Sequence, residues 1–451
     1  MADPDLLLQQ INSATARIGV IGLGYVGLPL ATTFGQNGYR VTGIDVDRTK
    51  LEALARDQSY IQDVPSALIA SLRAEGRFSA TDDYGALKAC DVVFICVPTP
   101  MTAQKSPDLA FIDAATRGIA AQLRDGHLII LQSTTYPGTT EEFVLPRLSA
   151  NGLTVGRDFF LAFSPERIDP GHTSSSGFNV ANTPKVVGGV TPACTRLAAA
   201  LLEHLTATVH VVSSPRAAEM SKLLENTFRS VNIALVNELA LLCERMGMDV
   251  WEVITAAATK PYGYMPFYPG AGVGGHCIPV DPYYLSWKAR EYDFFTRFIE
   301  FAADTNQLMP YHVVELIGQA LNRAGKHVSG ARILVLGVAF KANIDDARNS
   351  PAERVMELLL ERGAAIEYSD PHVPQFKVGQ NVFYRPPLTL QSKALSAETL
   401  AACDCAVITT AHREFDYEQI VRHAPLVVDT TNATRHVQHH REKIVRIGAP
   451  L

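Results

Sequence analysis

The stretch Arg17-Ile-Gly-Val-Ile-Gly-Leu-Gly-Tyr-Val-Gly-Leu-Pro-Leu-Ala31 decides the fold, because it runs from an apolar strand through a glycine-rich turn into a helix. Gly22 permits the tight turn, Gly24 lets the backbone approach a pyrophosphate, and Gly27 lets the helix pack closely on the strand. In such a turn the phosphates lie at the N-terminus of the helix, which is predicted over residues 28–36. The turn therefore predicts a dinucleotide site.

The residues that follow indicate which dinucleotide is bound. A second strand is predicted over residues 40–44, and Asp45 follows it, about twenty residues after the glycines. A carboxylate at this position accepts hydrogen bonds from the ribose hydroxyls, whereas it repels the 2′-phosphate of NADP. We therefore expect NAD as the cofactor.

Three further buried parallel strands are predicted from apolar runs within residues 91–100, 127–135 and 159–167, each of which ends in polar and turn residues. Ligands bind beyond the carboxyl ends of such strands, so Thr99 and Thr134 are expected to face the cofactor. Glu166 follows the third strand at the same rim, and an ordinary surface glutamate is the alternative interpretation. Together these elements predict a doubly wound α/β domain over residues 1–213.

Composition excludes several classes of function. At roughly 100–200 residues per domain, 451 residues suggest two or three domains. The formal charge of −6 offers no basic surface for nucleic acid. The N-terminus lacks the basic region of a signal peptide and no apolar run reaches the ~20 residues of a membrane span, so we expect a soluble, cytoplasmic protein. The seven cysteines form no disulfide pattern, and Cys403 and Cys405 are predicted to be buried strand residues rather than metal ligands.

A helix of about thirty residues is predicted over residues 216–246, which contain no proline or glycine. It is longer than one globular core requires, so we expect it to join domains and to pack against a second subunit in a homodimer or larger homo-oligomer. Lys222 and Asn226 lie four residues apart and hence on one face. The apolar residues at helical spacing are Met220, Leu223, Leu224, Phe228, Val231, Leu235 and Leu239.

A glycine- and proline-rich loop, Tyr268–Tyr284, holds Cys277 next to His276 and four residues before Asp281. Most cysteines are small buried hydrophobic residues, and this is the alternative interpretation of Cys277. The loop shows neither periodic burial nor metal-ligand spacing, so it favours a nucleophile instead. A thiol with the reference pKa of about 8.5 needs a nearby cation or base to react at neutral pH.

A further helix is predicted over residues 292–321, broken or bent at Pro310, and it completes a central domain of residues 214–325. A second α/β unit is predicted over residues 326–451, and no GxGxxG follows its first strand. The strands and helix predicted there cover residues 331–336, 350–362, 365–370, 405–410 and 426–429. Its loop from Phe340-Lys341 to Arg348 mixes basic and acidic residues, which suits a phosphorylated ligand.

Over nearly its full length the chain resembles the nucleotide-sugar dehydrogenases, the UDP-glucose/GDP-mannose dehydrogenase family. The motifs that carry this resemblance stand in the order of that family. They are Gly22–Gly27, Val97–Pro100, Ser133-Thr134, Ser164–Glu166, Lys222–Asn226, Gly274–Asp281, Ala339–Lys341 and Asp345–Pro351.

The resemblance implies an NAD-dependent, four-electron oxidation of the 6-hydroxyl of a UDP-sugar to a carboxylate. Cys277 would add to the intermediate aldehyde and pass through a thiohemiacetal to a thioester. Lys222 and Asn226 would hold the C6 oxygen and stabilise its negative charge, as a preorganised cation and amide can. Asp281 would orient groups beside the cysteine.

The remaining site residues are also implied by the resemblance. Thr134 and Glu166 would lie at the substrate and the water. The cofactor contacts would be Gly22, Gly24, Tyr25, Val26, Gly27, Asp45, Lys50, Thr99, Thr134 and Arg348. The nucleotide-sugar contacts would be Glu166, Lys222, Asn226, Phe267, Tyr268, Gly274, Phe340 and Lys341.

One segment departs from the UDP-glucose enzymes, because Pro165-Glu-Arg-Ile-Asp-Pro-Gly171 places Pro170 where they carry a second glutamate. The base that activates water for thioester hydrolysis is then Glu166 as first candidate or Asp281 as second. The segment resembles the branch that acts on UDP-N-acetylglucosamine, with UDP-N-acetylmannosamine and UDP-glucose as alternatives.

Two other functions fit part of the sequence. A β-hydroxyacid dehydrogenase also joins a dinucleotide domain to a helix with a lysine and an asparagine, but it needs neither Cys277 nor the C-terminal unit. A non-catalytic protein that binds a nucleotide sugar or NAD would keep the glycines, but it has no need of Cys277, Lys222, Asn226 and Asp281 together.

Overall fold

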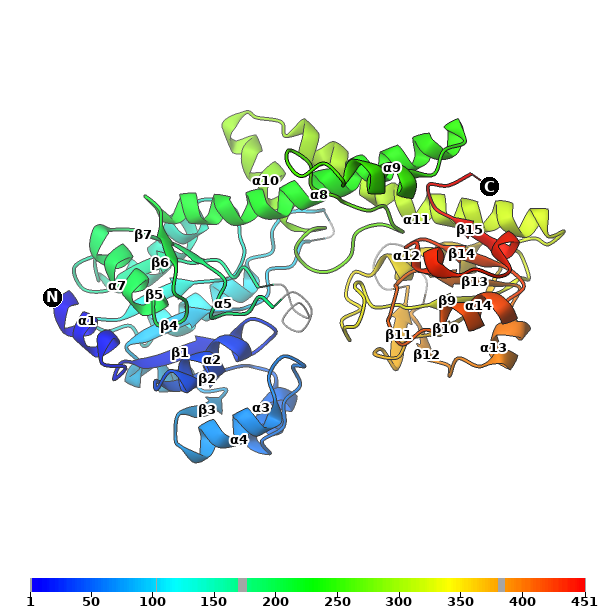
Figure 1. Ribbon diagram of the computed structural model, residues 1–451. Coiled ribbons are helices and arrows are strands. Elements are labelled where there is room, and N and C mark those ends of the chain that lie inside the picture. Colours follow the sequence, from blue (N-terminus) through cyan, green and yellow to red (C-terminus); the bar gives the residue numbers. More distant parts are fainter. Residues whose placement is uncertain (1, 103, 169–176, 380–385, 451) are drawn as a thin grey trace. The chain divides into compact units, whose positions relative to one another are not determined.

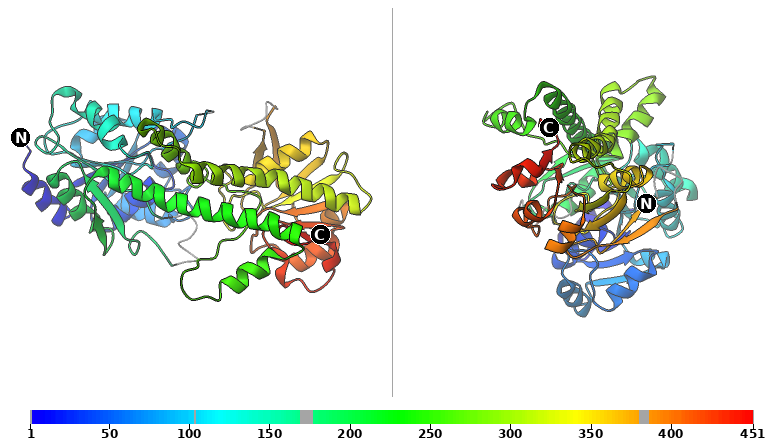
Figure 2. Two further views of the ribbon diagram at one scale, coloured as in Figure 1. Left: turned by 90° about the horizontal axis from the view of Figure 1, so that it is seen from above. Right: turned by 90° about the vertical axis from the view of Figure 1, so that its right-hand side faces the viewer.

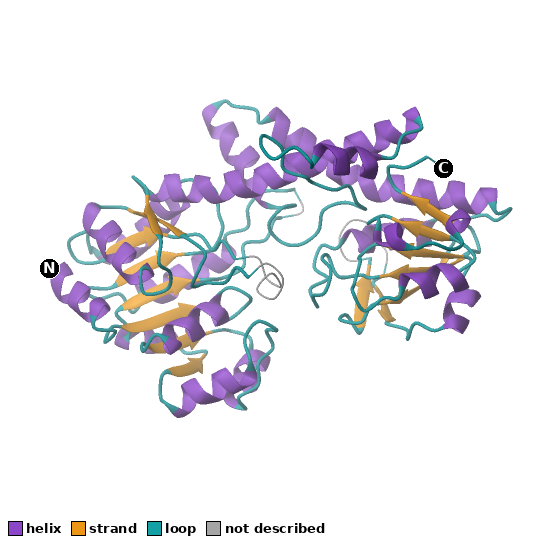
Figure 3. Cartoon of the chain, viewed as in Figure 1, coloured by secondary structure: helices purple, strands orange, loops and turns teal. Residues whose placement is uncertain are grey.

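The computed structural model describes residues 2–102, 104–168, 177–379 and 386–450. It consists of two compact units, Met1–Glu225 with Trp287–Phe294 and Asn226–Ser286 with Phe295–Leu451. The predicted α/β class is confirmed, with a doubly wound sheet in the N-terminal part, long central helices and a second α/β sheet in the C-terminal part (Figures 1 and 3). Within the described ranges, no helix combines the length and the apolar character that a membrane span requires.

An eight-stranded sheet in the order β3-β2-β1-β4-β5-β6-β7-β8 forms the centre of the first unit. Its neighbouring strands are parallel except for β6 and β7, which are antiparallel. The first six follow the 3-2-1-4-5-6 order of dinucleotide-binding sheets. The strands are β1 (Arg17–Ile21), β2 (Arg40–Ile44), β3 (Phe78–Thr81), β4 (Val92–Ile95), β5 (Leu128–Leu131), β6 (Phe160–Phe163), β7 (Lys185–Gly189) and β8 (Val209–Val211).

Helices cover both faces of this sheet. They are α1 (Pro4–Asn12), α2 (Gly27–Gln36), α3 (Arg48–Ala55), α4 (Ser66–Ala74), α5 (Ala110–Ala120), α6 (Leu145–Leu148) and α7 (Pro192–Leu202), with the short helices η1 (Tyr84–Ala89), η2 (Thr139–Val144) and η3 (Ser149–Asn151). Val92 and Phe94 of β4 join one core with α2, α4 and α7, whereas Val93 and Ile95 join a second core with α5 and α6. Successive side chains of a strand point to opposite faces, so a strand covered on both faces is apolar throughout.

A five-stranded parallel sheet in the order β10-β9-β13-β14-β15 forms the centre of the second unit, beside an antiparallel hairpin of β11 and β12. The strands are β9 (Arg332–Leu336), β10 (Ala365–Ser369), β11 (Gln375–Val378), β12 (Leu388–Gln391), β13 (Cys405–Ile408), β14 (Val427–Asp429) and β15 (Ile444–Arg446). Cys403 and Cys405 are buried, as predicted, and Cys405 begins β13. Cys403 corrects the prediction of a strand residue, because it lies before the strand, directly after the helix α13 (Ala397–Ala402).

The helices of the second unit again cover two faces of its sheet. They are α9 (Val250–Ala257), α11 (Arg297–Arg323), α12 (Pro351–Glu361), α13 (Ala397–Ala402) and α14 (Tyr417–His423), with η5 (Ala433–His436) and η6 (Arg441–Lys443). Ile333 and Val335 of β9 share a core with α11 and α12, whereas Leu334 and Leu336 share one with α13 and α14. The helices α8 (Pro215–Met246) and α10 (Asp281–Ala289) supply residues to both units, and η4 (Arg290–Tyr292) follows α10.

Helix α8 confirms the long helix predicted over residues 216–246. Its apolar residues occupy two faces, since Leu223 is fully buried whereas Leu224 is 65% exposed. The exposed apolar face repeats every three, four or seven residues and comprises Met220, Leu224, Phe228, Leu235, Leu239, Leu242 and Met246. The buried face also carries polar side chains, among them Glu219, Lys222, Asn226 and Asn237.

Of the helix predicted from Tyr292, broken or bent at Pro310, α11 corrects the start and the break. It runs without interruption from Arg297 to Arg323 (Figure 2). Pro310 lies inside the helix and is buried. An interior proline costs about 3 kcal/mol. Packing offsets this cost, because the flanking Met309 and Val313 are fully buried in the core of the second unit.

Candidate active site

The turn between β1 and α2 has room for a ligand. Gly22 has a φ of +90°, and a Cβ at Gly27 would lie 1.8 Å from the carbonyl oxygen of Gly22. A Cβ at Gly24 would meet no atom within 4 Å, so internal packing does not require glycine at this position. Tyr25 and Val26 pack on the core, and no side chain among the described residues caps the start of α2. Open space and uncapped N–H groups fit a pyrophosphate.

Asp45 lies beside this turn, as the sequence predicts. Its carboxylate is 7% exposed, and Oδ2 accepts hydrogen bonds from the N–H of Leu23 at 2.8 Å and from Lys50 Nζ at 3.1 Å. Oδ1 accepts from the N–H of Asp47 at 2.9 Å. The structure therefore brings the predicted ribose acceptor, Lys50 and the glycine turn together in the first unit.

Thr99 and Thr134 follow the neighbouring strands β4 and β5, and both are partly exposed. Ser133 joins the two loops, because its hydroxyl donates to the carbonyl oxygen of Val97 at 2.8 Å. These loops lie at the carboxyl edge of the sheet, where ligands bind in this fold.

Glu166 belongs to a buried network that sequence reasoning missed. Its Oε2 accepts from Lys185 Nζ at 2.7 Å and from Gln132 Nε2 at 2.9 Å. Its Oε1 accepts from the N–H groups of Arg167 at 2.7 Å and Ile168 at 2.8 Å. The side chain of Lys185 is 1% exposed. Four donors match the roughly four lone-pair positions of a carboxylate.

This network holds Glu166 in its ionised form. Burial alone would raise the pKa of Glu166, but the charge and hydrogen bond of Lys185 and the backbone hydrogen bonds outweigh it and lower the pKa. A general base works best when its pKa lies near the operating pH. The geometry therefore weakens Glu166 as the base for thioester hydrolysis. Pro170, which marks the departure from the UDP-glucose enzymes, lies outside the described residues.

Lys222 lies on a segment of α8 that is anchored by Glu219. This anchor was not predicted from the sequence. Glu219, fully buried and three residues earlier, accepts from the N–H of Gly138 at 2.5 Å, from the N–H of Thr140 at 2.9 Å and from the Thr140 hydroxyl at 2.6 Å. Burial raises the pKa of Glu219, although these hydrogen bonds oppose the shift. The anchor ties α8 to the chain just after the loop of Thr134.

Three predicted catalytic residues come together in the second unit. Asn226 Nδ2 donates to Asp281 Oδ2 at 2.5 Å, and the N–H of Asp281 donates to the carbonyl oxygen of Cys277 at 2.8 Å. Asn226 is fully buried and Asp281 is 2% exposed. Cys277 is exposed, whereas the other six cysteines are buried. Only Cys277 is thus placed to meet a substrate.

The second half of the cysteine loop packs on loops of the C-terminal sheet. A Cβ at Gly274 would lie 2.7 Å from the Cβ of Phe340, so this close approach requires glycine. The N–H of Gly275 donates to the carbonyl oxygen of Arg348 at 3.2 Å, and Asn349 Nδ2 donates to the carbonyl oxygen of Gly275 at 3.1 Å. Predicted substrate and cofactor contacts, Gly274, Phe340 and Arg348, are therefore neighbours.

Aromatic contacts hold the start of the cysteine loop. Phe267 meets Phe228 of α8 edge to face, with ring centroids 5.8 Å apart. Tyr268 stacks on Trp251 of α9 at 6.0 Å and remains 53% exposed. Lys341, the last predicted nucleotide-sugar contact, is partly buried.

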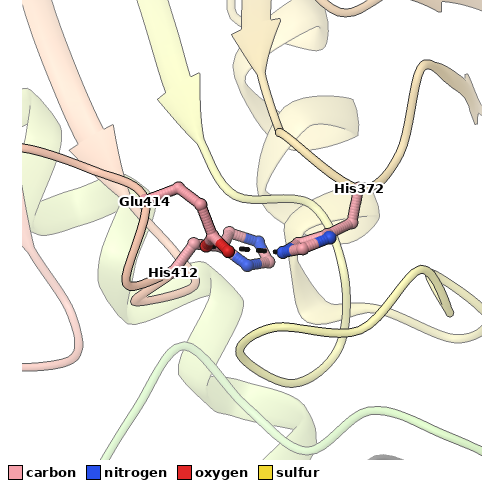
Figure 4. A group of neighbouring side chains, drawn as sticks. All are labelled: His372, His412 and Glu414. Atoms are coloured by element: carbon pink, nitrogen blue, oxygen red, sulfur yellow. Dashed lines mark ion pairs between the residues drawn. The ribbon is translucent and has the colours of Figure 1, made fainter.

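A group of titratable residues, His372, His412 and Glu414, lies in the C-terminal sheet domain (Figure 4). His412 Nδ1 accepts from the N–H of Asn343 at 3.0 Å, and its Nε2 lies 3.1 Å from Asp370 Oδ2. Both ring nitrogens are therefore engaged, which leaves no lone pair for a metal. Glu414 lies 3.4 Å from His372 Nε2. His412 thus belongs to a structural hydrogen-bond network, whereas the buried Nε2 of His372 has no hydrogen-bond partner among the described residues.

Family models match in three consecutive parts of the chain. All three describe the UDP-glucose/GDP-mannose dehydrogenase family. They are its NAD binding domain over residues 16–206, its central domain over residues 216–308 and its UDP binding domain over residues 334–436.

Individual relatives cover most of the chain. UDP-N-acetyl-D-glucosamine 6-dehydrogenase from Pseudomonas aeruginosa is 37% identical over 401 residues, 88% of this chain and 91% of that relative. UDP-N-acetyl-D-mannosamine dehydrogenase from Pyrococcus horikoshii is also 37% identical, over 358 residues, 79% of this chain and 84% of that relative. A solved structure of UDP-D-ManNAc dehydrogenase from Pyrococcus horikoshii matches with a TM-score of 0.85 at 32% identity, covering 96% of this chain and 99% of that one.

We predict that Gly24→Ala and Gly27→Ala separate cofactor binding from folding. Gly24→Ala should melt like the native protein but bind NAD⁺ more weakly, because its methyl group enters only the open space of the turn. Gly27→Ala should lower the melting temperature, because its methyl group meets backbone. Calorimetric NAD⁺ titration and thermal unfolding measure the two effects. Native NAD⁺ affinity in Gly24→Ala would contradict the assignment of the turn.

We predict that Lys185→Met reverses the pH dependence of stability. In the native protein the lowered pKa of Glu166 gives a contribution that is present above the ordinary glutamate pKa and lost as pH falls. Without Lys185 the pKa should rise, so stability should be greatest in acid and fall as pH increases through the ordinary value. Removing one partner of a buried pair costs about 3–5 kcal/mol. Melting temperatures between about pH 4 and 8 measure this.

The matched control is the double variant Lys185→Met/Glu166→Gln, which removes both charges. It should recover most of the lost stability and show no dependence on the titration of this site. If the single variant Lys185→Met keeps the native melting temperatures across the pH range, the Lys185–Glu166 pair contributes nothing to stability.

Proposed function

The chain belongs to the UDP-glucose/GDP-mannose dehydrogenase family and is an NAD-dependent oxidoreductase of nucleotide sugars, and we propose that it oxidises the C6 hydroxyl of UDP-N-acetylglucosamine to the carboxylate. The hydrogen-bonded group of Asn226, Asp281 and exposed Cys277 carries the proposal. An enzyme that only interconverts alcohol and carbonyl has no need of an exposed cysteine held in this way.

Two NAD⁺ molecules, bound in succession, would each accept one hydride from C6. The residues proposed to hold them are Gly22, Gly24, Tyr25, Val26, Gly27, Asp45, Lys50, Thr99, Thr134 and Arg348. Supporting observations are the open space at Gly24 and the position of Asp45 beside the turn.

Lys222 and Asn226 are proposed to stabilise negative charge on the C6 oxygen, first as the hydroxyl loses its proton and later in the tetrahedral adducts. They lie one helical turn apart on α8, so an ammonium and an amide project from one face. The amide nitrogen of Asn226 carries two hydrogens, and its bond to Asp281 uses one of them.

Cys277 is proposed to add as a thiolate to the aldehyde carbon of the intermediate, forming a thiohemiacetal whose former carbonyl oxygen carries the negative charge. Loss of the second hydride leaves a thioester on Cys277. Water then attacks the thioester carbon, the C–S bond breaks, and the thiolate and the carboxylate product separate. The positive charge of Lys222 favours each anionic stage of this sequence.

Asp281 is proposed as the group that accepts the proton of the hydrolytic water. It is bonded to the backbone of Cys277 and lies within one helical turn of it. Glu166 is proposed to keep a positioning role, because four donors occupy its carboxylate. Hydrolysis of the thioester by the double variant Lys185→Met/Glu166→Gln would support this choice, and a thioester that accumulates in that variant would return the role to Glu166.

The nucleotide sugar is proposed to contact Phe267, Tyr268, Gly274, Phe340 and Lys341, in addition to Lys222 and Asn226. Similarity alone leaves the sugar open, since relatives that act on N-acetylglucosamine and on N-acetylmannosamine are equally identical to this chain. The segment from Pro165 and the aromatic-proline run before the cysteine loop favour UDP-N-acetylglucosamine. We propose three domains for these functions. They are an NAD-binding domain at residues 1–213, a central helical domain with the cysteine loop at 214–325 and a UDP-sugar-binding domain at 326–451.

A homodimer packed along α8 is also proposed. Its support is the exposed apolar face of the helix, on which Leu224, Leu235 and Met246 are 65%, 53% and 60% exposed. Faces of this kind mark protein–protein contacts in soluble proteins. Sedimentation that gives a monomer at every concentration would remove this proposal.

We predict that UDP-N-acetylglucosamine has a higher kcat/KM than UDP-N-acetylmannosamine or UDP-glucose, with two NADH formed per carboxylate. Single-site discrimination between such sugars is worth about 1–3 kcal/mol. Side-by-side initial rates at 340 nm, with product analysis, measure this. A clear preference for another of the three sugars would overturn the substrate, and one NADH per product would overturn the four-electron reaction.

We predict that Cys277→Ser reduces steady-state NADH production by about 1000-fold or more, because a serine hydroxyl is a poor nucleophile without a strong base. Binding of NAD⁺ and UDP-sugar should persist, and a first hydride transfer should remain in a single turnover. The native enzyme should show a thioester on the Cys277 peptide after acid quench. Near-native two-NADH turnover by Cys277→Ser would show that the cysteine loop is structural.

A further inference from the structure

We propose that two buried amides, Asn237 of α8 and Asn306 of α11, position Cys277 by fixing the entrance of its loop. The role proposed for Cys277 is the premise of this inference. Neither asparagine belongs to the predicted site, and they are 69 residues apart in the sequence. They act on the reaction through the backbone of the loop, so they are positioning residues.

The two amides form one continuous chain of hydrogen bonds. The N–H of Gly270 donates to Asn237 Oδ1 at 3.1 Å, Asn237 Nδ2 donates to Asn306 Oδ1 at 2.9 Å, and Asn306 Nδ2 donates to the carbonyl oxygen of Ser230 at 3.1 Å. A backbone donor stands at one end and a backbone acceptor at the other. These ends allow only one orientation of each amide, so the chain is internally consistent.

The surroundings of this chain are apolar, which makes the pair costly unless it is satisfied. Asn237 is fully buried and Asn306 is 6% exposed, while Val236, Ala240 and Met309 beside them belong to the core of the second unit. A buried polar group without a partner costs about 1–3 kcal/mol. Helix packing alone would be served by leucines here. What the amides add is the bond to the N–H of Gly270.

The chain completes a set of fixed points along the loop. A Cβ at Gly272, where φ is +127°, would lie 3.3 Å from the carbonyl oxygen of Asn306, so the backbone of α11 touches the loop directly. Gly275 is bonded to Arg348, and the exit is fixed by the bond between Asn226 and Asp281. At the entrance, Tyr268 stacks on Trp251 through its side chain, and Asn237 supplies the hydrogen bond that holds the backbone at Gly270.

The glycine content of the loop explains why its entrance must be fixed. Four glycines stand between residues 270 and 275, and glycine loses more conformational freedom on folding than any other residue. A thiol that must meet one carbon atom tolerates little displacement, since a shift of about 1 Å can reduce a rate about 100-fold. Fixed points at both ends therefore hold the thiol within reach of its reaction geometry.

The test compares Asn237→Leu with Val236→Ala, a control on the same helix that removes buried apolar volume and breaks no hydrogen bond. Each variant is examined for melting temperature, for the rate of Cys277 alkylation by iodoacetamide, and for the two hydride transfers in single turnovers. The other six cysteines are buried, so alkylation of the folded protein reports on Cys277.

Both variants should lose stability, but only Asn237→Leu should alkylate several-fold faster and lose at least about tenfold in the second hydride transfer. Its first hydride transfer and its KM for the UDP-sugar should stay close to those of Val236→Ala. A variant Asn237→Leu that matches Val236→Ala in alkylation and in the second transfer would overturn the proposal.

Asn306→Ala provides a second route if Asn237→Leu does not fold, because it removes the support of Asn237 and leaves the bond to Gly270. It should show the same changes to a smaller extent, and an unchanged second transfer would again overturn the proposal. Cys277→Ser, measured in parallel, separates the two ideas. Failure of that variant to block the second transfer would refute the role of Cys277, whereas the alkylation rates still report whether Asn237 holds the loop.

Discussion

The structure depends on the requirement that polar groups on the buried face of α8 find partners. Glu219, Asn226 and Asn237 are each fully buried, and each is hydrogen-bonded to a segment outside the helix. Glu219 accepts from the backbone of Thr140, whereas Asn226 and Asn237 bond to opposite ends of the cysteine loop. A buried polar group without a partner costs about 1–3 kcal/mol, so the rotation of the helix and the course of each loop are chosen together. Lys222 lies in this row of polar residues. Helix α8, which carries the lysine that we propose as a catalytic cation, thereby also fixes the segments that bond to its buried face.

Much of the architecture could be predicted from the sequence, because local patterns decide it. The apolar strands, the glycine turn and the uninterrupted α8 all follow from residues close together in the chain. Long-range pairs could not be predicted in this way. Lys185 begins an apolar strand and resembles a surface lysine until Glu166 is placed beside it. Asn237 did leave a signal, since asparagine is a poor helix former and stands inside a long helix. Pro310 is the converse case. Its local preference favours a break in the helix, but α11 continues through it because Pro310 is buried.

The two sheets share one local arrangement, in which the turn after the first strand donates hydrogen bonds to the end of the neighbouring strand and to the aspartate that follows it. They differ in the partners of that aspartate. In the first, the N–H of Gly22 donates to the last residue of β2 at 2.8 Å, and the next N–H donates to the carboxylate of Asp45 at 2.8 Å. In the second, the N–H of Gly337 donates to the last residue of β10 at 2.9 Å, and the next N–H donates to Asp370 at 2.6 Å. Both glycines have positive φ, at +90° and +81°. The missing GxGxxG therefore concealed a repeated strand-turn-acid geometry.

The difference lies in what completes the hydrogen bonding of each acid. Asp45 is 7% exposed and lies beside an open turn, and the side chain of its partner Lys50 is partly exposed. Asp370 has no exposed side-chain surface and accepts from His412 and from the N–H groups of His372 and Val373. Donors from the protein already bond to both carboxylate oxygens of Asp370, so this side chain cannot accept hydrogen bonds from a ribose. The ligand contacts that we propose for the second sheet lie instead in its loops, where Phe340 packs against Gly274 of the cysteine loop.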